Sequence, residues 1–261
     1  MSVIEKETKT EFWYAFNEYI EKTSIMPGNV PRMFRGVSDK SYELIPSIGR
    51  GTRDNTDNKV SSLENDLIEE FKRLSIPVLE QYPTSAFEWL FLAQHYGLPT
   101  RLLDWSSNPL VALFFAIEND NNDGAIYVVG HEFDDQYELF DHKTADVNAE
   151  TKNNEPRLNN IIALQQDIGK FIFVRPKYTD QRYLNQKSIF SCHANPFESL
   201  DLLGTTKFII KKEWKRRIRA KLDLYGITHS FIYPGLDGVA RELRIRHYDP
   251  VQKGTATHTT L

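Results

Sequence analysis

Apolar residues recur at helical spacing in several parts of the chain, with charged residues between them. In the first of these segments Phe12, Phe16 and Ile20 share one face, and Pro27 and Gly28 then break the pattern. A later segment opens with Asn108 and Pro109, which are typical of a helix start. The pattern predicts helices over residues 9–23, from 62 onward, over 85–96, from 109 onward and over 211–225.

Strands are predicted where short apolar runs end in glycine or polar residues. The clearest run is Gly-Ala-Ile-Tyr-Val-Val at residues 124–129. Further strands are predicted at residues 33–37, 102–103, 170–174, 186–192 and 207–210. Polar residues at 50–61 and 131–159 indicate a surface loop and a variable excursion. Because strands and helices do not alternate regularly, we expect an α+β fold with small mixed or antiparallel sheets and inserted helices.

Composition narrows the class of protein. The 261 residues are 40% apolar and 12% aromatic, which suffices for a sizeable core in one domain. A single cysteine, Cys192, excludes an internal disulfide and a cysteine-based zinc site, and fits a reducing compartment. No signal-peptide pattern and no apolar run of membrane-spanning length is present, so we expect a cytoplasmic protein without a membrane partner. The net charge of -4 gives no overall attraction to nucleic acid.

The densest group of polar residues, at 94–109, lies between two apolar segments. Stability alone would favour apolar residues there, so this density indicates a site. His95, Arg101 and Asp104 are candidates for general base, anion clamp and orienting group. The alternative is a structural network in which Asp104 caps a turn and pairs with Arg101. Metal-ligand spacing is absent, so no metal is expected.

The end of this segment coincides with the predicted start of a buried helix. Backbone N–H groups and the helix dipole favour an anion at such a position, and Ser106 and Ser107 would add hydroxyl donors. Capping of the helix would explain Asn108, but not the whole polar cluster. Trp105 is a candidate to stack on a base or a nicotinamide, although a tryptophan beside an apolar helix is more often part of the core.

Two further features have both a functional and a structural interpretation. Arg35 ends a short apolar strand and precedes Gly36, so it could grip a phosphate or carboxylate with two parallel bonds; the alternative is a surface arginine. The basic run at residues 211–219 could touch nucleic acid, but a solvated helix face is the simpler interpretation.

These motifs resemble the FRG domain family, which is named for its Phe-Arg-Gly motif, found here at residues 34–36. Residues 93–106 are similar to the most diagnostic block of the family, and residues 231–238 resemble its C-terminal signature. One departure is Ser188, which stands where the family pattern has glycine. We therefore divide the chain into an N-terminal helix at 1–30, a single FRG domain at 31–249 and a flexible tail at 250–261.

The family is distantly similar to ADP-ribosyltransferases, and this resemblance implies an ADP-ribosyltransferase-like core with NAD as substrate. The implied NAD-binding residues are Arg35, Gly36, Thr100, Arg101, Trp105 and Ser106, and the implied catalytic residues are His95, Asp104, Gln186 and Asp237. An acidic residue is expected where Gln186 stands. Either Asp104, Asp237 or Glu242 supplies the carboxylate, or the chain binds a nucleotide without cleaving it.

The first hypothesis is an NAD-using ADP-ribosyltransferase or NAD glycohydrolase, acting as a bacterial toxin or phage-defence effector. The second is a non-catalytic module that binds a nucleotide or nucleic acid through the same pocket and the basic helix. A third is a metal-free nuclease that uses His95 and Asp104. A protein partner such as an antitoxin leaves no readable pattern in the sequence.

Overall fold

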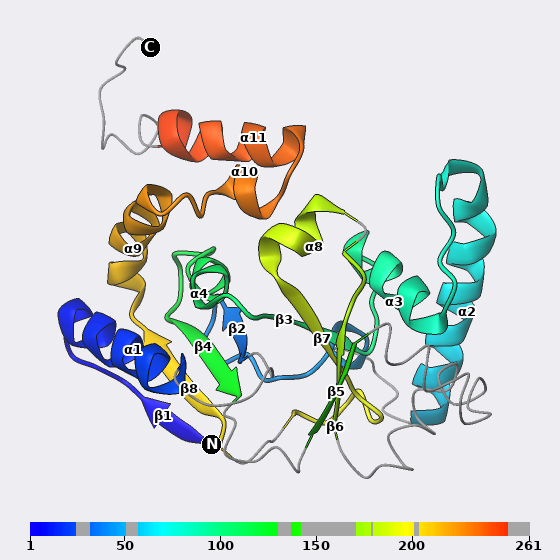
Figure 1. The fold of residues 1–261 in the computed structure, drawn as a ribbon, viewed down its shortest axis with the longest axis horizontal. Helices are drawn as coiled ribbons and strands as arrows, with labels where there is room; N and C mark the ends of the chain where they lie inside the picture. The colour runs from blue at the N-terminus through cyan, green and yellow to red at the C-terminus, as the bar shows by residue number, and fades with distance from the viewer. Residues whose placement is uncertain are drawn as a thin grey trace.

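The computed structural model describes residues 1–24, 32–50, 57–129, 137–141, 171–178, 180–200 and 204–249 (Figure 1). Within these ranges eight strands form one sheet in the order β1-β8-β4-β2-β3-β7-β6-β5. The strands are β1 (Ser2–Ile4), β2 (Met33–Val37), β3 (Leu102–Ser106), β4 (Gly124–Val129), β5 (Tyr137–Asp141), β6 (Phe171–Arg175), β7 (Ser188–Cys192) and β8 (Thr206–Ile210). Neighbouring strands are antiparallel except for the parallel pairs β1/β8 and β5/β6.

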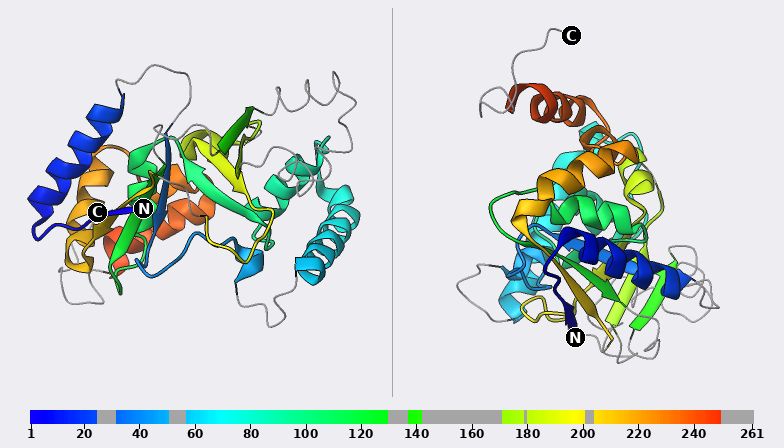
Figure 2. Two further views of the ribbon diagram at one scale, coloured as in Figure 1. Left: turned by 90° about the horizontal axis from the view of Figure 1, so that it is seen from below. Right: turned by 90° about the vertical axis from the view of Figure 1, so that its left-hand side faces the viewer.

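Helices pack mainly on one face of this sheet (Figures 1 and 2). They are α1 (Lys9–Ser24), α2 (Asp57–Ser75), α3 (Ala86–His95), α4 (Pro109–Ala116), α8 (Gln181–Gln186), α9 (Lys212–Leu224), α10 (His229–Ile232) and α11 (Leu236–Leu243), followed by a π-helical turn (Arg244–Tyr248). Helices α1, α4 and α9 share one hydrophobic cluster with β2, β4 and β8, while α3 and α8 share another with β3, β6 and β7. None of the described helices is long and apolar enough to cross a membrane.

The alternation of side chains along β2 separates two sides of the sheet. Phe34 faces the helices, whereas Met33 and Val37 join a cluster on the opposite side. Leu44 and Leu200, which lie outside the strands, cover part of that second side. Since Arg35 alternates with Phe34, it starts from this second side.

Local sequence signals explain where two of the helices begin. The hydroxyl of Ser85 accepts a hydrogen bond from the backbone N–H of Glu88, and the Glu88 carboxylate accepts one from the N–H of Thr84, so α3 starts at a capping arrangement. Asn108 accepts a hydrogen bond from the N–H of Leu110 and caps α4, with Pro109 in its first position. Both starts agree with the sequence-based prediction.

The structure corrects several predictions. The strands form one large sheet rather than small ones, because β3 joins the group β1-β8-β4-β2 to the group β7-β6-β5. The strand expected from Gln186 begins at Ser188, since Gln186 ends α8 and Lys187 adopts a left-handed conformation (φ 50°). Asp237, one of the implied catalytic residues, lies in the first turn of α11. The predicted tail at 250–261, and most of the excursion at 131–159, lie outside the described residues.

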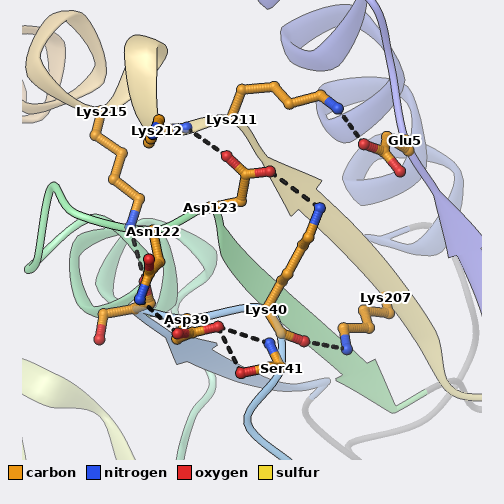
Figure 3. Close-up of polar contacts among 11 residues, drawn as sticks. Glu5, Asp39, Lys40, Ser41, Asn122, Asp123, Lys207, Lys211, Lys212 and Lys215 are labelled. Atoms are coloured by element: carbon orange, nitrogen blue, oxygen red, sulfur yellow. Dashed lines mark hydrogen bonds and ion pairs between the residues drawn. The ribbon is translucent and has the colours of Figure 1, made fainter.

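A polar network ties the loop after β2 to the start of α9 (Figure 3). The carboxylate of Asp123 binds Lys40 Nζ at 3.0 Å and the backbone N–H of Lys212 at 2.9 Å. Asn122 donates to Asp39 at 2.6 Å. Lys207 Nζ donates to the Lys40 carbonyl at 2.7 Å. These bonds hold the loops around β2, β4 and α9 together at one end of the sheet.

The sheet is weakly joined at its middle. Strands β2 and β4 pair over five positions, but β2 and β3 pair only through Phe34 and Ser106. Beyond that pair, the described strands provide no partner for the backbone of β3 on the side that faces β2. Asp104 lies in this unpaired part of β3, and on its other side it pairs with Phe190 of β7.

Candidate functional site

Beyond the pair Phe34–Ser106, strands β2 and β3 do not pair with each other, and the side chain of Arg35 bridges this opening between them. Its Nη1 donates a 2.5 Å hydrogen bond to the backbone carbonyl of Asp104 and lies 3.9 Å from Oδ2 of the same residue. Among the described residues, the buried Nε of Arg35 has no hydrogen-bond partner. Burial lowers the pKa of Arg35 to about 10, so the guanidinium remains a cation at neutral pH.

Asp104 is the exposed residue of β3. Its side chain is 61% exposed, while the other four residues of the strand are buried. Its negative charge acts to raise the pKa of both His95 and Tyr183, which places these groups within its electrostatic range. An accessible carboxylate therefore lies beside the largely buried cation of Arg35 and within electrostatic range of an imidazole.

His95 ends helix α3 and lies between aromatic rings. Its ring is 5.3 Å from that of Tyr183 and 5.0 Å from that of Tyr96, measured between centroids. Nδ1 lies 3.3 Å from a carboxylate oxygen of Asp180. Burial lowers the pKa of His95 in spite of the opposing effect of Asp180, so the imidazole is neutral at pH 7.

A cleft of about 640 Å³ opens beside His95, between α3, α8 and the start of α11. Arg182 and Arg241 both approach the ring of Tyr233, with guanidinium carbons 5.2 and 5.9 Å from its centroid. Asp237 also lines this cleft. The volume falls within the range of small-molecule sites, and the lining combines cations, carboxylates and aromatic rings.

Glu118 connects two of these cleft residues. It accepts a hydrogen bond from the hydroxyl of Tyr233 at 3.1 Å and pairs with Arg241 at 3.1 Å. Burial and the nearby carboxylate raise the pKa of Tyr233, so its phenol stays protonated. Arg182, Tyr233 and Arg241 are not predicted as site residues from the sequence. Only Tyr233 lies within a motif, and isolated arginines in helices give no signal.

Other predicted site residues are held in buried contacts. Arg101 forms an ion pair with Glu64, whose carboxylate also accepts from the Arg101 backbone N–H at 2.8 Å. Arg101 therefore does not pair with Asp104, as the structural alternative supposed. The Thr100 hydroxyl donates to the side chain of Gln94, and the Thr100 N–H donates to Ser47 Oγ at 3.1 Å. Thr100 and Arg101 thus link β3 to neighbouring segments.

The residues around the end of β3 are also engaged. Trp105 Nε1 donates to Ser191 Oγ at 2.9 Å, and its ring is buried. The Ser106 hydroxyl donates to the carbonyl of Gln186 at 2.6 Å. The Gln186 amide donates to the Ile232 carbonyl at 3.0 Å. These side chains position β3, α8 and α10, so their contacts account for their polarity without a ligand.

Two motif glycines permit close packing of backbone on backbone. A Cβ added at Gly36 would lie 1.8 Å from the carbonyl oxygen of Ala112 in α4. A Cβ at Gly238 would lie 1.7 Å from that of Tyr233. In this structure the close approach expected at Gly36 is made by a helix.

Residues 31–125 match the family model of the FRG domain. The chain contains an FRG domain. The matched range includes Arg35, Gly36, His95 and Asp104, and so covers the opening between β2 and β3 and one wall of the cleft. In the FRG domain the Phe-Arg-Gly motif thus supplies Phe34 to the core, Arg35 to the opening and Gly36 to the helix contact. No curated protein and no solved structure is significantly similar to the chain.

Proposed function

We propose that this FRG domain protein is an ADP-ribosyltransferase-like enzyme that binds NAD and cleaves its nicotinamide–ribose bond. The observation that carries the proposal is the accessible carboxylate of Asp104, held beside the largely buried cation of Arg35 and near the neutral imidazole of His95. Cleavage of this bond develops positive charge on the ribose, which a fixed carboxylate stabilises.

The adjoining cleft supplies groups suited to the rest of the dinucleotide. Arg182 and Arg241 are guanidinium donors for a diphosphate. Tyr96, which is 71% exposed, offers a flat face for a base or a nicotinamide. Arg35 already donates to the Asp104 carbonyl, which favours a positioning role for it rather than a diphosphate clamp.

In the proposed reaction one bond to ribose C1′ breaks, another forms, and one proton is released. The bond between ribose C1′ and the nicotinamide nitrogen breaks, and its electron pair leaves with neutral nicotinamide. An acceptor, or water in a glycohydrolase, forms the new bond to C1′ and loses a proton. His95, neutral at pH 7, is the base for that proton. Such an activity would suit a bacterial toxin or a phage-defence effector.

A second candidate is a module that binds a nucleotide without cleaving it. Gln186 favours this reading, because it stands where the resemblance expects an acidic residue and its amide is bound to the Ile232 carbonyl. In that case the cleft would bind NAD and no nicotinamide would appear.

The test is calorimetric titration with NAD, followed by assay of the same mixture for free nicotinamide. We expect binding with release, and a loss of about a hundredfold in release rate in Asp104→Asn. The matched control is Asp66→Asn, which changes an exposed carboxylate on α2 and should release nicotinamide at the normal rate. Binding without release supports the second candidate. Absence of NAD binding, or full activity in Asp104→Asn, would contradict the proposal.

A further inference from the structure

A second cleft, of about 860 Å³, lies between α9, α11 and the loop that follows α4. Figure 2 shows α9 and α11 as neighbours at this end of the molecule. Its charged lining consists of Glu118, Asp120, Asp223 and Asp249 together with five arginines, which are Arg216, Arg219, Arg241, Arg244 and Arg246. The arginines come from helix α9, helix α11 and the π-helical turn, so only the tertiary structure gathers them.

This end of the chain is positively charged although the protein as a whole is acidic. Residues 211–249 contain ten Lys and Arg and five Asp and Glu, while the whole chain carries 32 and 36. A local excess of cations attracts a polyanion even when the net charge is negative. The net charge of -4 therefore does not describe this surface.

Two lysines at the start of α9 are already engaged in the fold. Lys211 pairs with Glu5 (Figure 3). Lys215 donates to the carbonyls of Ser38 and Asn119 at 2.8 and 2.5 Å. Lys215 is fully buried. A ligand of the second cleft would therefore meet the arginines.

Three of the five arginines, Arg219, Arg241 and Arg246, already pair with carboxylates, and the other two are the more open to new contacts. Within the described part of the chain, no ion-pair partner is found for Arg216, which is exposed. Arg244 pairs with Asp249 at 3.3 Å and has a side chain that is 70% exposed. Surface pairs of this kind contribute little stability, so a phosphate can replace the carboxylate at small cost. A guanidinium holds a phosphate through two parallel hydrogen bonds.

We infer that the second cleft binds the phosphodiester backbone of a nucleic acid strand. Five arginines from three elements match a ligand with repeated phosphates better than a single small anion. Arg241 lines both clefts, so a bound strand passes directly beside the proposed NAD cleft. That the strand is the acceptor of ADP-ribose rests on the proposed function: a nucleophilic oxygen or nitrogen of the strand bonds to C1′ and loses a proton as nicotinamide leaves.

Binding is tested first, by fluorescence anisotropy with a labelled 20-nucleotide single strand of DNA and one of RNA. We expect affinity that falls steeply as salt rises. In Arg216→Gln/Arg244→Gln we expect at least a tenfold loss and a shallower salt dependence. The control, Lys22→Gln/Arg73→Gln, removes the same charge from exposed helix positions elsewhere and should bind normally.

No binding at low salt, or equal losses in both double variants, would overturn the inference. Binding of fluorescently labelled polyglutamate without any affinity for either strand would also overturn it, in favour of an acidic protein. The acceptor role is tested with NAD labelled in its ADP-ribose portion. Transfer of the ADP-ribose label to the strand supports that role. Release of nicotinamide without transfer of this label to the strand contradicts it. Strand binding is measured without NAD, so this test of the second cleft does not depend on whether the proposed enzyme activity is found.

Discussion

Arg35 donates a 2.5 Å hydrogen bond from Nη1 to the backbone carbonyl of Asp104, across two strands whose ladder consists of the single pair Phe34–Ser106. The side chain thus satisfies a strand carbonyl that faces the opening. It also keeps a positive charge 3.9 Å from the Asp104 carboxylate. Arg35 therefore provides a hydrogen bond to a strand carbonyl that β2 does not pair with, and it also holds the carboxylate of Asp104, the proposed catalytic group.

The variant Arg35→Lys tests whether a positive charge is enough, or whether the guanidinium group is needed to bind the Asp104 carbonyl and to hold the Asp104 carboxylate. Lysine keeps the cation but lacks the planar fork, so it cannot reproduce the guanidinium geometry. We expect the free energy of unfolding in urea to fall by about 2 kcal/mol. We also expect the rate constant of NAD cleavage to fall more than the affinity for NAD. Arg73→Lys on exposed α2 is the control. Unchanged stability and turnover in Arg35→Lys would show that the fork is not needed.

Gly36→Ala tests the contact between β2 and α4. The added Cβ would lie 1.8 Å from the Ala112 carbonyl, so a helix or a strand must move. We expect a loss of about 3 kcal/mol or more in unfolding free energy. Gly97→Ala meets no atom within 4 Å but needs a positive φ of 88°, and should cost about 1 kcal/mol. Equal urea midpoints for the two variants would contradict the packing argument.

The buried ion pair between Arg101 and Glu64 predicts strong coupling. Their side chains are only 4% and 6% exposed, so removing one partner leaves the other charge buried without its counter-ion. Glu64→Gln should lower the unfolding free energy by about 3 kcal/mol. The double variant Glu64→Leu/Arg101→Met should lose less than the sum of the two single changes. Strict additivity in urea denaturation would show that the pair is not coupled.

Two buried histidines predict that the protein loses stability in acid. Burial lowers the pKa of both His193 and His229 to about 4. The unfolded chain takes up protons near pH 6.5, so it binds more protons than the folded chain between pH 6.5 and 4, and stability falls as pH drops through this window. From pH 7 to pH 5 we expect each histidine to contribute a loss of about 2 kcal/mol.

The measurement is the free energy of unfolding in urea at pH 7 and pH 5. His193→Gln/His229→Gln should reduce the difference between the two pH values, whatever its effect at pH 7. His247→Gln removes an exposed histidine and should leave the difference as it is. A double variant with the full pH dependence would exclude the two buried histidines as its source.

Prediction of the fold from sequence succeeded where the determining contacts are local. The cap at Asn108 and the apolar run after it placed α4, and the β-rich run at 124–129 placed β4. It failed where partners are distant. The single sheet depends on β3 pairing with β7, more than 80 positions later in the chain, and no local period reports such a pairing.

The same division applies to the candidate site. The polar density of residues 94–109 pointed to His95 and Asp104. His95 lines the cleft, and the side chain of Asp104 is exposed and available to a ligand. The polar density pointed equally to Arg101, Trp105 and Ser106, whose hydrogen-bond partners lie 37, 86 and 80 residues away in the sequence. Polarity alone does not distinguish a side chain that meets a ligand from one that meets another segment of the fold.

The sequence by itself therefore determined the local elements, the FRG motifs and the segment in which polar chemistry concentrates. The tertiary structure decided which of these side chains are buried, that Arg35 faces Asp104 across an unpaired stretch of backbone, and that Arg182 and Arg241 meet at Tyr233. The physical reason is that capping and hydrophobic periodicity act over a few residues, whereas burial and hydrogen-bond partners are set by contacts between segments far apart in the chain.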